Sequence, residues 1–226
     1  LEFMSSHNTG RGRYAAHFDG DGQLLMGCHD GIRVYTDDYE KPIKTIRASH
    51  VTSVGSLGSK SHHIYIQHSE DERTLRKLSV DTETSADLFK FQLPGNRAAN
   101  ATASTECAVA FGKESLVVYS LLHKTISTVP LRYQPKNVRF DAGGYLLIAS
   151  YSGLHKYTVD KRGSLTLIWK CKDVSGAAGI AFTKYGDIVV ASFKDKEVYI
   201  ISPQGLSCKC LAARITVNLY GADSIF

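Results

Sequence analysis

The chain has 226 residues, and 43% of them are hydrophobic, which is enough to build the core of one large domain or two small ones. It has no run of about 18 apolar residues and no secretory signal layout at its N-terminus, so we expect neither a membrane-spanning helix nor a membrane partner. The net charge of +5 is compatible with an anionic partner but does not require one.

The first residues are expected to lie outside the folded domain. Leu1-Glu2-Phe3 precede Met4 and look like the remnant of a cloning site, so residues 1–12 are interpreted as this remnant and an N-terminal tail. From residue 13 onward, short runs rich in Val, Ile, Tyr, Leu and Thr are separated by Gly, Asp, Asn and Ser. Such runs are typical of strands, so the sequence predicts a single, nearly all-β domain over residues 13–226.

The predicted strands recur in groups of four. The first group contains "QLLMGCHDGIRVYT", and the second has a longer acidic insert, Glu70-Asp71-Glu72, between its second and third strands. In the third group Gly112-Lys113 replaces the usual turn. The last two groups match in nearly every position class over "YLLIASYSGLHKYTV" and "DIVVASFKDKEVYII". The copies lie near residues 14–51, 52–97, 98–136, 137–178 and 179–212, with a partial copy at 213–226.

This spacing of about 38 to 46 residues is the length of a four-stranded propeller blade. A β-sandwich also uses short strands, but it does not predict one four-strand order repeated five times. We therefore predict an all-β fold, a β-propeller of four-stranded antiparallel blades. The second strand of each blade should be buried on both faces, which explains the continuous apolar run Leu146-Leu147-Ile148-Ala149. Third strands, such as His155-Lys156-Tyr157-Thr158, should alternate between buried and exposed positions.

The fifth copy resembles the NHL repeat, in which an inner strand, a Gly-Asp turn, a hydrophobic strand ending in Val-Ala and a polar turn follow in order. The matching segments are Ile180-Ala181-Phe182, Gly186-Asp187, Val189-Val190-Ala191-Ser192, Lys194-Asp195-Lys196, Val198-Tyr199-Ile200-Ile201 and Gln204-Gly205. The fourth copy matches less well. The Asn-His pair usual before the third strand is absent, and no Trp-Asp or Gly-His signature of WD repeats occurs. The resemblance implies six blades, the sixth incomplete or built from both termini, while five also satisfy the sequence.

Motifs that carry catalysis are absent from the sequence. The inner strands offer His17 and Arg139 among apolar residues and no carboxylate cluster, so we expect no enzyme and no small-molecule substrate. His17 is interpreted as a core or channel residue. The five cysteines are odd in number and irregularly spaced, which favours a reducing compartment and predicts a cytoplasmic protein. No second Cys or His pair follows Cys208-x-Cys210, so neither a metal nor a cofactor is expected.

A binding platform is the function class that remains, because loops carry binding on such rings. Loops that join first to second and third to fourth strands are acidic, whereas the opposite loops are basic once the acidic insert of the second copy is set aside. One hypothesis is a protein-interaction platform, and the NHL resemblance extends it to substrate recognition by a tripartite-motif ubiquitin ligase. The alternative is binding of single-stranded RNA to the basic face. The candidate partner-binding residues are Arg97, Arg132, Tyr133, Lys136, Tyr151, Phe193, Lys194 and Lys196.

Overall fold

A computed structural model shows five four-stranded sheets in residues 13–18, 22–36, 41–59, 62–69, 72–92 and 101–213, which are the residues that the structure describes. Every strand pairs antiparallel with its neighbours within its sheet. Across these residues no helix is long and apolar enough to span a membrane.

The first sheet contains β1 (Arg13–Phe18), β2 (Leu24–Cys28), β3 (Gly31–Tyr35) and β4 (Lys44–Arg47). The second contains β5 (Val51–Ser59), β6 (His62–Ser69), β7 (Glu72–Ser79) and β8 (Thr84–Phe91). The third contains β9 (Ala101–Ala103), β10 (Cys107–Phe111), β11 (Ser115–Ser120) and β12 (Ile126–Pro130). The fourth contains β13 (Pro135–Phe140), β14 (Leu146–Ser150), β15 (Gly153–Val159) and β16 (Leu165–Cys171). The fifth contains β17 (Ala177–Phe182), β18 (Ile188–Ser192), β19 (Glu197–Ile201) and β20 (Cys208–Ala213).

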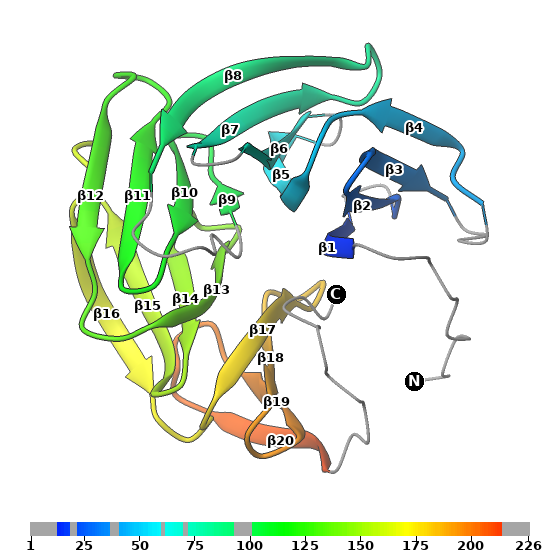
Figure 1. Ribbon diagram of the computed structural model, residues 1–226. Helices are drawn as coiled ribbons and strands as arrows, with labels where there is room; N and C mark the ends of the chain where they lie inside the picture. Colours follow the sequence, from blue (N-terminus) through cyan, green and yellow to red (C-terminus); the bar gives the residue numbers. More distant parts are fainter. Residues whose placement is uncertain are drawn as a thin grey trace.

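The five sheets stand around a common axis as the blades of a propeller, with the first strand of each sheet innermost and the fourth outermost (Figure 1). Consecutive inner strands contact one another from β1 to β5, β9, β13 and β17. The predicted all-β propeller of four-stranded antiparallel blades is therefore confirmed, with five blades in the described residues. The predicted tail at 1–12 and the sixth partial copy at 213–226 lie outside these residues, except for Ala213, and stay predictions.

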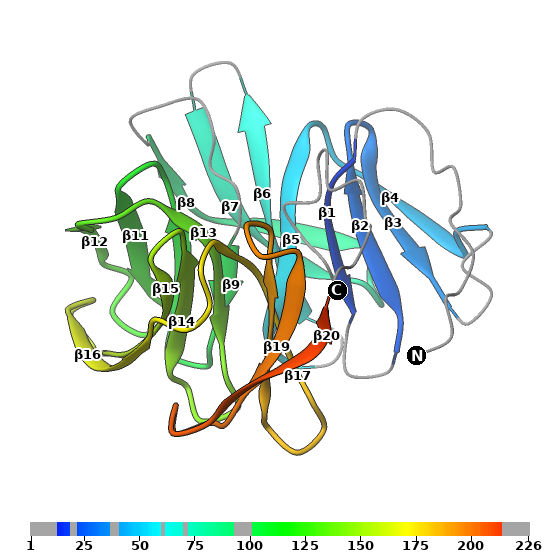
Figure 2. The same cartoon turned by 90° about the horizontal axis from the view of Figure 1, so that it is seen from below.

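The inner strands run from one face of the ring to the other, so the connections gather on two faces (Figure 2). The turns between second and third strands and the links between blades form what we name the Tyr151 face. The turns between first and second and between third and fourth strands form the Asp141 face. Strand β13 runs from one face to the other. It begins on the Tyr151 face, just after the link from the third blade, and ends on the Asp141 face at the turn that contains Asp141.

Hydrophobic clusters between adjacent blades form the core. The middle strand β14 shows why the predicted apolar run is needed: Leu146 and Ile148 pack toward the third blade, whereas Leu147 and Ala149 pack toward the fifth. All of these side chains are fully buried. Because successive residues of a strand point to opposite faces, only a continuous apolar run can satisfy both neighbours.

The blades at the two ends of the described series are covered less completely. On β18 of the fifth blade, Ile188 and Val190 are buried but Val189 is half-buried. On β2 of the first blade, Leu25 is buried whereas Met26 is half-buried. Within the described residues, the second strand of each end blade is therefore covered by a neighbouring blade on one of its two faces.

One local expectation is wrong. His155 and Lys156 on β15 are both buried, so this third strand does not alternate at these positions, because the Lys156 ammonium forms an ion pair with Asp141 at 2.8 Å. The acidic insert of the second copy falls where it was expected, between the second and third strands: β6 ends at Ser69 and β7 begins at Glu72, whose carboxylate pairs with Lys90 at 2.8 Å. Glu70 and Asp71 lie outside the described residues.

Candidate binding site

Three predicted residues, Lys136, Tyr151 and Phe193, come together on the Tyr151 face. Tyr151 opens the turn after β14, and Phe193 opens the corresponding turn after β18 in the next blade. Their ring centroids lie 5.0 Å apart at an interplanar angle of 86°, which is the edge-to-face arrangement that aromatic pairs favour. The Lys136 Nζ lies 4.5 Å from the centre of the Tyr151 ring, a cation–π contact. We name these three residues the aromatic cluster.

Gly176, in the link between the fourth and fifth blades, fastens the two turns of the cluster to each other. Its N–H donates to the Tyr151 carbonyl at 3.1 Å, and its carbonyl accepts from the Phe193 N–H at 3.1 Å. Its φ of +65° lies in the left-handed region, and a Cβ atom here would lie 2.7 Å from the Cβ of Lys194. Glycine is therefore required where the three segments meet.

Two exposed lysines, Lys194 and Lys196, follow Phe193 on its turn. The acidic residue between them, Asp195, is held back in the turn, where its carboxylate accepts from the Ser175 N–H at 3.2 Å and the Ser192 hydroxyl at 3.0 Å. The turn therefore presents its positive charges to solvent beside the cluster. Tyr151 is 50% exposed and Phe193 37% exposed, so an approaching partner can reach both rings.

The other predicted residues lie elsewhere. Tyr133 is half-buried, its hydroxyl is 2.8 Å from that of Tyr157, and its ring stacks on His155 at 4.3 Å. Burial, followed by the hydrogen bond to Tyr157, raises the pKa of Tyr133. Arg132 is exposed on the link between the third and fourth blades. Arg97 lies outside the described residues.

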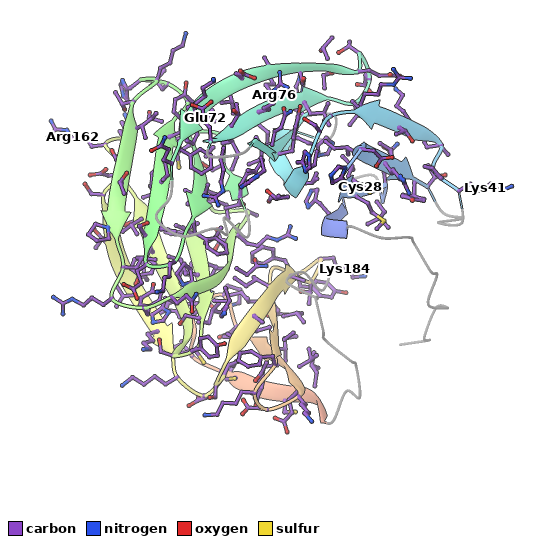
Figure 3. All side chains as sticks on the ribbon, in the orientation of Figure 1. Cys28, Lys41, Glu72, Arg76, Arg162 and Lys184 are labelled. Carbon is purple, nitrogen blue, oxygen red and sulfur yellow. The ribbon has the colours of Figure 1, made fainter. Side chains whose placement is uncertain are left out.

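A cavity of about 810 Å³ opens on the ring axis toward the opposite, Asp141 face. Its walls are inner-strand residues of four blades, among them His17, Thr102, Arg139 and Phe182, and its rim includes the turn that begins at Asp141. Lys156 is already paired with this carboxylate and also donates to the Pro203 carbonyl at 3.0 Å, which ties the fourth blade to the fifth. In Figure 3, Lys184 of the same face lies near the centre of the ring, whereas Lys41 and Arg162 project from its outside.

His17 is neutral at the wall of this cavity. The Arg139 guanidinium lies 3.1 Å from its Nδ1, so that nitrogen accepts and the proton of the neutral ring belongs on Nε2. Burial, followed by the charge of Arg139 and by His63, lowers the pKa of His17 to about 3. The buried Nε2 has no hydrogen-bond partner in the part of the chain that the structure describes. The wall thus combines a cation with a neutral N–H donor.

A cysteine cluster that the sequence did not predict lies between the outer strands of the fourth and fifth blades. Ligand atoms of Cys171, Asp173 and Cys208 all lie within 4.8 Å of one another. Burial and the neighbouring Cys171 thiol raise the pKa of Cys208 to about 12. A zinc-site pattern needs a second ligand pair after Cys208-x-Cys210, whereas the pair Cys171-x-Asp173 comes one blade earlier in the chain.

No known family model matches the chain, and neither does any curated protein. Solved structures match its fold. Virginiamycin B lyase from Staphylococcus aureus aligns at a TM-score of 0.60 and 13% identity, over 96% of this chain and 73% of the lyase. An auxiliary nutrient binding protein from Bacteroides thetaiotaomicron aligns at 0.61 and 12%, over 89% of this chain and 57% of that protein.

The extracellular domain of a putative hybrid two component system from B. thetaiotaomicron aligns at a TM-score of 0.58 and 15% identity. This match covers 92% of the present chain, which spans 28% of the length of that protein. These structural matches establish the shared propeller fold. Because the sequence identities are low, the function has to be argued from the site.

Proposed function

We propose that the chain is a non-catalytic binding platform that holds a protein partner on its Tyr151 face, with the aromatic cluster at the centre of the contact. The observation that carries the proposal is the exposed edge-to-face pair of Tyr151 and Phe193, fixed in position by Lys136 and Gly176. A partner therefore meets rings whose conformations are already ordered, which reduces the entropic cost of binding. Aromatic residues of this kind dominate the binding energy of protein interfaces.

The geometry of the rings supports a protein over single-stranded RNA. RNA binding of this kind depends on aromatic faces on which bases can stack. The Lys136 ammonium already lies over the Tyr151 ring, and His155 already stacks on the Tyr133 ring. Of the three aromatic candidates Tyr133, Tyr151 and Phe193, on which bases would stack, two are thus engaged with other side chains. Contact with an aliphatic side chain needs no free parallel face.

The charges around the cluster indicate the chemistry of the partner. Lys136, Lys194 and Lys196 favour a protein surface that carries carboxylates around a central apolar side chain. Charge pairs at the rim mainly increase the association rate and select the partner, while the buried apolar contact supplies the affinity. The NHL resemblance supports the further proposal of substrate recognition for a ubiquitin ligase, and the odd cysteine count supports a cytoplasmic location.

Site-specific crosslinking tests the proposal. A photoreactive phenylalanine analogue is placed at Tyr151 and, as a control, at Tyr185. Tyr185 is a matched position because it is 78% exposed on the Asp141 face and Lys184 lies 5.0 Å from its ring centre. We expect a discrete protein adduct from position 151 that is lost with Phe193→Ala and is not formed from position 185. The same adducts from both positions would contradict the proposal.

A titration with single-stranded RNA at two salt concentrations tests the alternative. Phosphate contacts make such binding fall steeply as salt rises. We expect no salt-sensitive binding that depends on Lys136. Tight binding at low salt that is lost in Lys136→Glu but kept in Lys184→Glu would overturn the protein proposal in favour of RNA.

A further inference from the structure

The cysteine cluster has a donor set suited to a thiophilic metal ion. Cys171 ends β16, the outer strand of the fourth blade, and Asp173 follows two residues later in the link to the fifth blade. Cys208 begins β20, the outer strand of the fifth blade. Cys171 is buried, Cys208 is half-buried and Asp173 is exposed. Two thiols and a carboxylate therefore meet from both sides of the junction between two blades.

A third thiol lies on the strand that carries Cys208, outside the group of atoms within 4.8 Å of one another. Cys210 is two residues beyond Cys208 on the same strand, opposite Tyr199. Because side chains two apart on a strand lie on one face, Cys210 is on the same side of β20 as Cys208. It is exposed, as is Asp173, so the outer side of the cluster is accessible from solvent. An ion can reach the group without opening the core.

The spacing of the donor atoms fits tetrahedral coordination. With Zn–S bonds of about 2.3 Å and Zn–O bonds of about 2.1 Å, neighbouring ligand atoms of a tetrahedral site lie about 3.4 to 3.8 Å apart. The observed separations of no more than 4.8 Å need a small contraction to reach this geometry. Rotation of exposed Asp173 and half-buried Cys208 side chains can supply it, since neither is fixed by tight packing on all sides.

We propose that Cys171, Asp173 and Cys208 bind a Zn²⁺ ion at the junction of the fourth and fifth blades, with Cys210 as the fourth ligand. The ion joins the outer strands β16 and β20, which belong to different sheets. It also holds Asp173 in the same short link as Gly176, whose backbone fastens the turns of Tyr151 and Phe193. The site is structural, because four protein ligands leave no coordination position open for a substrate.

Cobalt substitution tests the site directly. The full chain, reduced and stripped of metal, is titrated with Co²⁺, whose absorption reports both thiolate ligation and tetrahedral geometry, and Zn²⁺ is then added to displace it. We expect one ion per chain, displacement by Zn²⁺ and a higher unfolding temperature with Zn²⁺. Cys171→Ser and Cys208→Ser should lose the thiolate absorption, and Asp173→Asn should weaken binding.

Cys107→Ser is the matched control, because Cys107 is a buried thiol between other blades and should leave the titration unchanged. Circular dichroism of each metal-free variant separates loss of a ligand from loss of the fold. A titration in which Cys208→Ser binds Co²⁺ as the parent does would overturn the proposal. Absence of Co²⁺ binding by the folded, reduced parent protein would also overturn it. The same holds if that protein binds no Co²⁺ and Cys171 and Cys208 form a disulfide under mild oxidation. An unchanged spectrum in Cys210→Ser would overturn the assignment of the fourth ligand.

Discussion

Mild acid should destabilise the protein, because two of its buried histidines, His17 and His155, resist protonation. His17 is 5% exposed and His155 is 3% exposed. Burial is the main cause that lowers the pKa of His17 to about 3 and that of His155 to about 4, from an ordinary value of 6.5. Between about pH 6.5 and pH 4 the unfolded chain binds protons at these sites and the folded chain does not. Stability therefore falls as the pH falls through this window.

The size of the effect depends on how far the pH lies below the pKa that each histidine has in the unfolded chain. One pKa unit corresponds to about 1.4 kcal/mol, so at about pH 5 each histidine lowers the free energy of unfolding by about 2 kcal/mol relative to pH 7. The two together account for about 4 kcal/mol, a large part of the roughly 5–15 kcal/mol typical of a folded protein. Asp30 and Asp160 have a pKa lowered from an ordinary value of 3.8, mainly by hydrogen bonds, so they titrate below this window.

Urea unfolding at about pH 7 and about pH 5 measures the loss. The variants His17→Gln and His155→Gln remove the titrating group, so each should lose about half as much stability between the two pH values as the parent does. The comparison uses the pH difference within each variant, which is independent of how much a substitution destabilises the fold at neutral pH. A parent protein equally stable at both values, or variants that lose as much as the parent, would refute the reasoning.

Three further substitutions test contacts within the fourth blade and at its junction with the fifth, each by the urea midpoint at neutral pH. Gly153→Ala should destabilise by at least about 1–3 kcal/mol, because φ is +120° and a Cβ would lie 2.2 Å from the Cys171 carbonyl oxygen; parent-like stability would show that the turn relaxes freely. Lys156→Met should cost about 1–3 kcal/mol by leaving the half-buried Asp141 carboxylate without its cation, and adding Asp141→Asn should recover part of the loss. Leu147→Ala should cost about 2–5 kcal/mol, and a loss below 1 kcal/mol would mean that the cluster between the fourth and fifth blades collapses around the gap.

Repetition made the fold predictable from sequence. A strand buried on both faces must be apolar throughout, so Leu146 to Ala149 marks the middle of a blade without any knowledge of its neighbours. The same reasoning applies less well to β18, where Val189 is half-buried although the sequence looks equally apolar. Its position at the end of the described series, rather than its composition, decides how much of it is covered.

The candidate site was predictable in residue type but not in orientation. Turn position identified Tyr151 and Phe193, and their convergence follows from equivalent turns of adjacent blades. Tyr133 has the same side chain as Tyr151 and also lies in a link between blades. Its hydroxyl is nevertheless hydrogen-bonded to the Tyr157 hydroxyl at the junction of the third and fourth blades. The direction of a side chain in a link between blades depends on packing that a single sequence does not encode locally.

The cysteine cluster shows a different limit. Spacing along the chain finds ligand pairs such as Cys208-x-Cys210, because alternate strand residues share a face. It does not show that β16 and β20 bring Cys171 within reach of Cys208. Two outer strands of adjacent blades are related by the ring, and that relation needs the three-dimensional arrangement.

The most direct test of the account is the affinity of the chain for the protein that crosslinks at position 151. Isothermal titration with that purified partner compares the parent with Tyr151→Ala and with the control Tyr185→Ala. Loss of a central aromatic residue costs about 2 kcal/mol or more, so Tyr151→Ala should weaken binding by about thirtyfold or more. Tyr185→Ala should leave the affinity unchanged. Equal effects of the two substitutions, or an unchanged affinity in Tyr151→Ala, would contradict a binding platform centred on the aromatic cluster.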